Sequence, residues 1–155
     1  MFFNRNEQKL FTLSRTDVGQ PLASYSKHAF ELDGFEWPSV EHYYQAMKFE
    51  DADYREQIRL ASHPADATKL GKSKKYSRRK DWDKLKVTFM TRGSYIKCRT
   101  HPEVAQALLD TGDLNIMEVS QYDYFWGGGR DLRGNNEFGK LLMGIRDKLR
   151  EEVEQ

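Results

Sequence analysis

Residues 37–49 read WPSVEHYYQAMKF, and this stretch predicts a helix opened by Pro38 and capped by Ser39. At about 3.6 residues per turn, Glu41, Gln45 and Lys48 fall on one face of that helix. Apolar side chains cover most of the remaining circumference, so the helix is predicted to be buried. Because buried charge is costly unless it is paired or functional, two interpretations follow: a Glu–Lys ion pair that bridges the core, or a functional site.

Outward from this helix, local patterns predict the other elements. Residues 29–37 alternate apolar and polar side chains around Asp33-Gly34, a favoured two-residue turn, and so predict a β-hairpin. Short strands are expected at residues 10–13 and 114–119, and a glycine-rich loop at residues 122–136. Further helices are expected at residues 51–60, 65–70, 83–99, 103–109 and 136–152.

Two of these helices carry a periodic face. The helix at 83–99 places six residues near one side: Leu85, Thr88, Phe89, Arg92, Tyr95 and Ile96. The helix at 136–152 has five apolar residues at helical spacing: Phe138, Leu141, Leu142, Ile145 and Leu149. Because the chain contains no repeat, low-complexity tail or linker, residues 1–155 are predicted to form a single compact α+β domain. It is predominantly helical and has a small β-hairpin or sheet.

Composition narrows the classes of function. The 155 residues include 25 basic and 24 acidic side chains, so the formal net charge of +1 provides no global field for nucleic acid or a membrane. The single cysteine, Cys98, permits no internal disulfide, which fits a reducing compartment. Neither Cys98 nor the four histidines show the spacing of metal ligands. No stretch, including the amino-terminal residues, has the apolar length of a signal peptide or a membrane span. We therefore expect a cytoplasmic protein without a metal site.

A second candidate constellation is the segment EVSQYDYFWGGG at residues 118–129. Asp123 supplies a carboxylate beside an aromatic cluster that includes Trp126. The glycines that begin at Gly127 allow backbone to approach a ligand closely. The alternative interpretation is an aromatic anchor followed by a flexible turn.

Two further constellations carry positive charge. Asn136 opens the last predicted helix after Arg130 and Arg133, an arrangement typical of an anion site, although Asn136 is equally typical of a simple helix cap. Residues 69–86 are strongly basic and enclose Tyr76 and Trp82, as in segments that bind phosphates and stack bases. A solvated face is the commoner origin of such charge, and Trp82 is either a lid over a flat ring or a core anchor.

Three blocks of the sequence match ordered motifs. Residues 37–49 are similar to W-P-[ST]-x-E-H-Y-[FY]-Q-A-x-K-F, and residues 123–127, DYFWG, to D-x-x-W-G. Residues 134–143, GNNEFGKLLM, are similar to G-x-N-x-L-G-x-L-L-M, with Phe138 in place of a leucine. In these blocks the chain resembles the YbiA-like proteins, also called the NADAR family. The resemblance runs from about Leu22 to Leu149, nearly the whole chain.

The resemblance implies a compact, mainly helical α+β domain with N-glycosidase activity and no cofactor. Bacterial members of the family are linked to two early riboflavin intermediates, which are reactive ribosylaminopyrimidine phosphates. Other relatives remove ADP-ribose from guanine in nucleic acid. By motif match, the lysine that can form a Schiff base with the ribose C1 is Lys48, and the catalytic residues that accompany it are Glu41, Asp123 and Trp82.

Further residues are expected to bind the phosphorylated ribosyl substrate. They are Gln45, Arg79, Lys80, Lys97, Trp126, Gly127 and Asn136. Trp126 would stack with Trp82 on the heterocycle, while the basic residues and the loop before the last helix would hold phosphate. One departure from the family lies at Ser24, where the family usually has an asparagine, and it alters the substrate contact expected there.

Three functions follow as alternatives. Hydrolysis of a ribosylaminopyrimidine phosphate needs negative charge near C1, supplied by Glu41 or Asp123, with Lys48 as the nucleophile. Removal of ADP-ribose from guanine would bring the basic residues 69–86 against a nucleic-acid backbone. A non-catalytic ADP-ribose or nucleotide sensor would use the same pocket without turnover.

Overall fold

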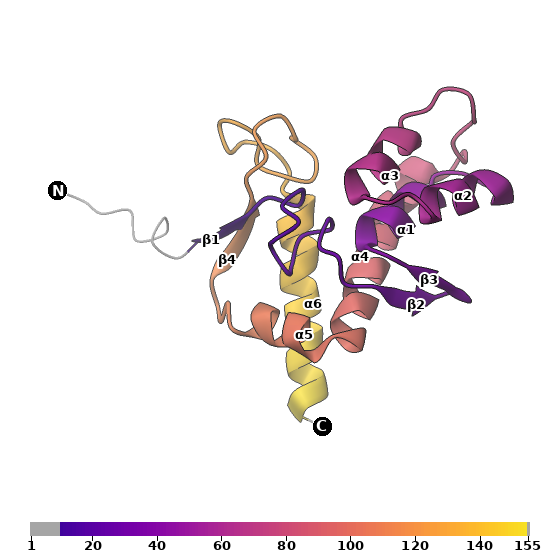
Figure 1. Cartoon of the computed structure of the whole chain (residues 1–155). Helices are drawn as coiled ribbons and strands as arrows, with labels where there is room; N and C mark the ends of the chain where they lie inside the picture. The colour runs from indigo at the N-terminus through magenta and orange to yellow at the C-terminus, as the bar shows by residue number, and fades with distance from the viewer. Residues whose placement is uncertain (1–9, 155) are drawn as a thin grey trace.

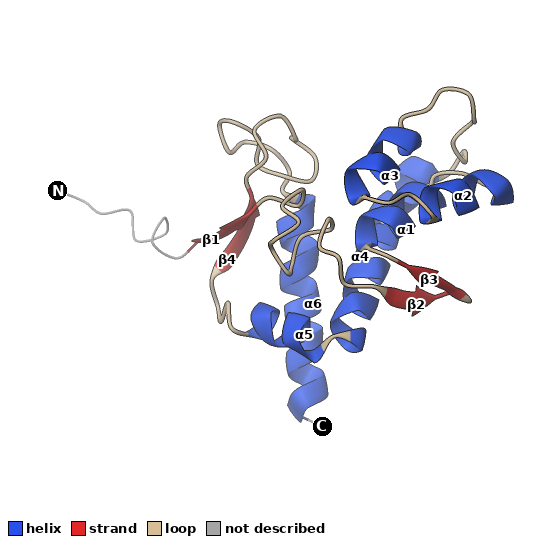
Figure 2. Ribbon diagram, in the orientation of Figure 1, coloured by secondary structure: helices blue, strands red, loops and turns tan. Residues whose placement is uncertain are grey.

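The computed structural model describes residues 10–154 and confirms an α+β fold dominated by helices (Figures 1 and 2). The nine amino-terminal residues, where no signal peptide was predicted, lie outside the described part of the chain. The helices are α1 (Val40–Met47), α2 (Ala52–Arg59), α3 (Pro64–Gly71), α4 (Trp82–Thr100), α5 (Pro102–Leu109) and α6 (Glu137–Glu154). The strands are β1 (Leu10–Leu13), β2 (Phe30–Leu32), β3 (Phe35–Trp37) and β4 (Asn115–Glu118).

The parallel pair of β1 and β4 joins the beginning of the described chain to its last third. The register runs from Leu10 opposite Asn115 to Leu13 opposite Glu118. Parallel strands end at the same edge, so the segment that follows β1 emerges beside the loop that follows β4 (Figure 1). Arg15 and Asp123, on these two segments, are thereby brought close together.

The antiparallel hairpin of β2 and β3 delivers the chain to the start of α1, as the sequence predicts. Asp33 and Gly34 take the positive φ values of 56° and 83° that a tight hairpin turn requires. Ser39 then caps α1, because its hydroxyl accepts a hydrogen bond from the backbone N–H of His42 at 3.2 Å. Every residue of α1 is buried, and the helix packs against α2, α3 and α4.

The buried side of α4 differs from the predicted face. Of the six residues placed near one side, none is fully buried, and Arg92 is exposed. The buried stripe consists instead of Met90, Gly93, Ser94 and Lys97, with Trp82 and Cys98. At Gly93 a side chain would lie 3.0 Å from the Tyr43 ring, so glycine permits α1 to cross α4 closely. Hydrophobic periodicity could not detect this face, because Gly93, Ser94 and Lys97 occupy positions in it where apolar residues would be expected.

The apolar face predicted for the last helix is confirmed in α6. Phe138, Leu142 and Ile145 are 0%, 1% and 3% exposed, and α6 packs against β4 as well as α4 and α5. The packing of α6 therefore fixes β4, and with it the loop that carries Asp123.

Within residues 10–154, no helix combines the length and the apolar character needed to cross a membrane.

Candidate active site

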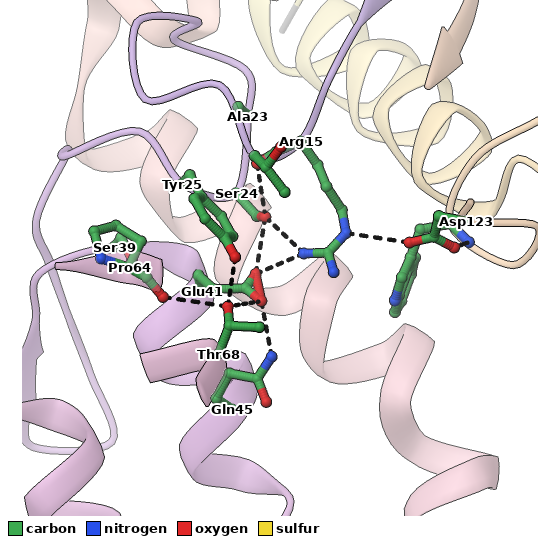
Figure 3. Close-up of polar contacts among 12 residues, drawn as sticks. Arg15, Ala23, Ser24, Tyr25, Ser39, Glu41, Gln45, Pro64, Thr68 and Asp123 are labelled. Carbon is green, nitrogen blue, oxygen red and sulfur yellow. Dashed lines mark hydrogen bonds and ion pairs between the residues drawn. The ribbon is translucent and has the colours of Figure 1, made fainter. Parts of the chain in front are cut away.

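Glu41 lies at the centre of a buried polar cluster to which the segment after β1, α1 and α3 each contribute side chains (Figure 3). Its carboxylate is 0% exposed and accepts four hydrogen bonds. Oε2 accepts from Arg15 Nη1 at 2.7 Å and from Ser24 Oγ at 2.9 Å. Oε1 accepts from Gln45 Nε2 at 2.8 Å and from Thr68 Oγ1 at 3.2 Å. A carboxylate held in this way stays in one orientation and needs no further partner.

The ion pair expected on α1 therefore exists, but its cation is Arg15 and not Lys48. The segment after β1 holds Arg15 in place: its backbone N–H donates to Glu118 Oε2 at 2.7 Å. Burial acts to lower the pKa of Arg15, but Glu41 and Asp123 more than offset it, so the pKa is raised. Arg15 is thus a permanent buried cation between two carboxylates.

Asp123 differs from Glu41 in having one oxygen open. Its Oδ1 accepts from the backbone N–H groups of Phe125 at 3.1 Å and Trp126 at 2.8 Å, which fixes the loop after β4. Its Oδ2 lies 3.6 Å from Arg15 Nε, which is beyond hydrogen-bond distance, and the side chain is 25% exposed. The two predicted carboxylates thus meet around one guanidinium, and Asp123 is the more accessible of them (Figure 3).

Lys48 is the C-cap of α1, and its amine has no hydrogen-bond or ion-pair partner among the described residues. Within residues 10–154, Nζ makes no ion pair or hydrogen bond, and it keeps contact with solvent although the residue is only 9% exposed. Burial lowers the pKa of Lys48 to about 8; Glu41 opposes this shift, and Arg78 and Arg15 add to it. A sizeable neutral fraction is therefore present near neutral pH, as a nucleophilic amine requires.

Aromatic side chains form one wall of the cluster. Lys48 Nζ lies 5.6 Å from the centroid of the Tyr44 ring. That ring packs against Trp82 at 5.1 Å and against Trp126 at 5.5 Å between centroids. Both tryptophans are buried, at 4% and 5% exposed, and Trp82 also stacks on Phe89. Both predicted stacking residues therefore pack on Tyr44 and are buried in the core.

Gln45 is wedged between Glu41 and the end of α3. While its Nε2 donates to Glu41, its Oε1 is buried without a hydrogen-bond partner in the described residues. A Cβ on Gly71 would lie 1.9 Å from that Oε1, so only glycine there leaves room for the amide. Gln45 consequently supports the orientation of Glu41.

Lys97 is not placed to hold a phosphate. Its ammonium donates to Pro21 O at 2.7 Å, Ala23 O at 2.9 Å and Ser26 Oγ at 3.0 Å, which uses all three hydrogens. The residue is 2% exposed, and burial lowers its pKa to about 8. Lys97 instead fixes the loop that presents Ser24 to Glu41.

Asn136 and Gly127 organise the loop after β4. The Asn136 side chain accepts from Glu118 N–H at 2.9 Å and donates to Ile116 O at 2.8 Å, so it clamps β4 and does not cap α6. A Cβ on Gly127 would lie 2.3 Å from Glu118 Oε1. The close approach that glycine permits here is to Glu118, the residue that holds Arg15.

The basic segment 72–80 is attached to the end of α1 beside Lys48. Arg79 N–H donates to Lys48 O at 2.7 Å, and Phe49 forms an isolated bridge with Arg78. The Arg79 guanidinium pairs with Asp81 at 2.6 Å, whereas Lys80 is exposed. Arg78 is also exposed, as are Lys72, Lys74 and Lys75, so this segment presents several basic side chains to solvent.

Arg15, Thr68 and Glu118 are site residues that sequence reasoning missed. They come from irregular or distant segments, and only the departure at Ser24 drew attention to that side of the cluster. A groove of about 600 Å³ between α4 and α6, which Arg92, Tyr95 and other residues line, contains none of the predicted site residues. No group of three or more metal-ligating side chains is assembled within residues 10–154.

Comparison with known proteins connects this arrangement to one family. The NADAR domain model matches residues 1–150. N-glycosidase YbiA of Escherichia coli (strain K12) is 35% identical over 136 residues, which cover 88% of this chain and 85% of that protein. A riboflavin biosynthesis protein of Vibrio vulnificus is 38% identical over 148 residues, which are 96% of this chain but 40% of that longer protein. The NMR structure of the E. coli protein YbiA matches with a TM-score of 0.86 at 32% identity, covering 95% of this chain and 88% of that one.

Proposed function

The chain belongs to the NADAR domain family, and from that premise we propose that it is an N-glycosidase acting on riboflavin-pathway intermediates. The bond cleaved is the one between ribose C1′ and a nitrogen of a ribosylaminopyrimidine phosphate. The observation that carries the proposal is Lys48, an unpaired amine of lowered pKa that lies beside the Arg15–Glu41–Asp123 cluster. We also propose a cytoplasmic location, which the single free cysteine, Cys98, supports.

Each of these site residues has its own role in the proposed reaction. Neutral Lys48 adds to C1′ as the bond from C1′ to the base nitrogen breaks, and the departing nitrogen takes up a proton from water. The proton that Nζ gives up passes to the ring oxygen as the bond from C1′ to that oxygen opens, which leaves an iminium between C1′ and Nζ. A water molecule then adds to C1′ and gives one proton to Nζ and the other to the carboxylate of Asp123, so that Lys48 leaves as the neutral amine and the sugar as its aldehyde. Glu41 keeps Arg15 in place and supplies negative charge near the electron-poor C1′.

A second candidate function is removal of ADP-ribose from guanine in nucleic acid. The exposed, basic segment beside Lys48 favours it, because Arg78 and Lys80 could meet a phosphate backbone there. Both functions would use the same lysine and carboxylates, so only a test of the two substrates can distinguish one function from the other.

Product analysis by mass spectrometry tests both functions. The purified protein is offered 5-amino-6-ribosylaminouracil 5′-phosphate and, separately, DNA that carries ADP-ribosylated guanine. We expect ribose 5-phosphate from the first substrate and no ADP-ribose from the second. Release of ADP-ribose alone would support the nucleic-acid function. Release of neither product would contradict both enzymatic functions and indicate a non-catalytic nucleotide-binding module.

The rate of the proposed reaction should increase with pH up to the pKa of Lys48. Because the active form is the neutral amine and the pKa is about 8, kcat/KM should rise about tenfold per pH unit below pH 8 and level off above it. Arg78 is one of the charges that lower this pKa, so Arg78→Met should move the inflection upward. Lys140→Met, on the exposed side of α6, should leave it unchanged. A profile that is flat or falling between pH 6 and pH 8 would remove Lys48 from the nucleophile role.

A further inference from the structure

Arg15 has a guanidinium edge that makes no hydrogen bond with the part of the chain that the structure describes. Nε is excluded from solvent and has no hydrogen-bond partner among the described residues. Its approach to Asp123 Oδ2 stops at 3.6 Å. Nη2, on the same edge, also makes no hydrogen bond within residues 10–154, yet it keeps contact with solvent. Buried donors are nearly always satisfied, so an unpaired one beside a charged site calls for a ligand.

The rest of Arg15 is held too firmly for this edge to turn elsewhere. The backbone N–H is bonded to Glu118, and Nη1 donates to Glu41 at 2.7 Å and to Ser24 at 3.2 Å. Glu118 and Glu41 are both 0% exposed. The unused donors therefore keep a fixed direction, toward the open oxygen of Asp123 (Figure 3).

The chemistry between Arg15 and Asp123 fits a hydroxyl group. A hydroxyl oxygen can accept from Nε or Nη2 while its hydrogen is donated to Asp123 Oδ2. A phosphate fits less well, because the two carboxylates of Glu41 and Asp123 already outnumber the single guanidinium. The guanidinium donors of Arg15 and the acceptor oxygen of Asp123 therefore favour a neutral group that both accepts and donates a hydrogen bond.

We propose that Arg15 and Asp123 form a subsite for the 2′-hydroxyl of the ribosyl ligand. The inference rests on the proposed function, because it places C1′ at Lys48, and the 2′-hydroxyl is carried by the adjacent carbon. Arg15 donates to Glu41 at 2.7 Å, and Glu41 shares one face of α1 with Lys48, about two turns further along. Hydrogen bonds to the 2-hydroxyl strengthen as charge develops at C1, so this subsite would act on specificity as well as on binding.

Calorimetric binding of ribose 5-phosphate and 2-deoxyribose 5-phosphate tests the subsite without requiring turnover. The intact protein should bind the ribose sugar about tenfold more tightly or better, as expected for one hydrogen bond with charged partners. Arg15→Lys keeps a positive charge for Glu41 but removes the two-donor edge. It should bring the ratio of the two affinities close to one, mainly by weakening the ribose sugar.

Two further variants make the result specific. Asp123→Asn removes the acceptor and should also bring the ratio close to one. Arg150→Lys, whose side chain contacts Gly112 and Asp113 away from the site, should keep the preference of the unmodified protein. Equal affinities in the unmodified protein, binding of neither sugar, or an unchanged ratio in a folded Arg15→Lys protein would each overturn the subsite. A preserved preference in a protein that hydrolyses no ribosyl substrate would overturn the proposed function alone.

Discussion

Replacing Lys48 with alanine should reduce kcat/KM for the ribosylaminopyrimidine phosphate by about a thousandfold or more while leaving the fold intact. Arg15, the basic residue that contacts Glu41, cannot take over the role, because its raised pKa keeps it protonated. Stability should change little, since the Lys48 side chain makes no ion pair or hydrogen bond within residues 10–154 and its charge is costly to bury. Steady-state kinetics and a thermal melt measure the two effects.

Lys48→Arg separates nucleophilicity from charge. Arginine keeps a cation at the end of α1 but remains protonated, so this variant should be as inactive as Lys48→Ala. Borohydride added during turnover should attach the sugar covalently to the unmodified protein and to neither variant, as intact-mass measurement would reveal. A folded Lys48→Ala protein with more than a tenth of normal activity would exclude the lysine as the nucleophile.

Glu41→Gln should lower the free energy of unfolding by about 3 kcal/mol or more. The substitution removes the negative charge that compensates buried Arg15. It also places an NH₂ group against hydrogen-bond donors that face a carboxylate oxygen in the unmodified protein. The displaced Arg15 edge and the lost negative charge should also reduce kcat/KM by about a hundredfold. Urea unfolding and initial-rate kinetics on the same preparation provide both quantities.

Asp33→Asn is the matched control for Glu41→Gln. Asp33 also forms an ion pair with an arginine, Arg92, but the two side chains are 45% and 46% exposed. Its loss should cost less than about 1 kcal/mol and leave activity unchanged. If Glu41→Gln were no less stable than this control, the buried pair would not be the anchor of the cluster.

Local signals in the sequence were sufficient for the elements around α1. The hairpin follows from Asp33-Gly34, which adopts the positive φ values of its turn, and the helix start follows from Ser39, which accepts a bond from His42 three residues later. Both signals involve residues only a few positions apart in the sequence. The stripe of Glu41, Gln45 and Lys48 was predicted by the same local geometry, and all three residues are buried.

Contacts between distant residues were not predictable in this way. The pair of Arg15 and Glu41 spans 26 positions, and the contact of Arg15 with Glu118 spans 103. A single sequence contains no periodic signal for such pairs, so the pattern on α1 suggests Lys48, and not Arg15, as a partner of Glu41 in the ion-pair interpretation. The buried face of α4 was missed for a related reason, because Gly93 and Ser94 are buried by the close approach of α1 and not by their own hydrophobicity.

The parallel ladder of β1 and β4 also determines how much of the chain must be synthesised before the pocket can assemble. A ribosome releases the chain from its amino end, so α1 and its carboxylate emerge long before β4 does. Until residues 115–118 are available, β1 has no strand to pair with, and Arg15 lacks the backbone bond to Glu118. The nascent chain can therefore expose Lys48 before Arg15 is positioned by Glu118 and before Asp123, the second carboxylate of the pocket, has been added. A complete pocket is thus confined to chains that have been synthesised at least as far as Asp123.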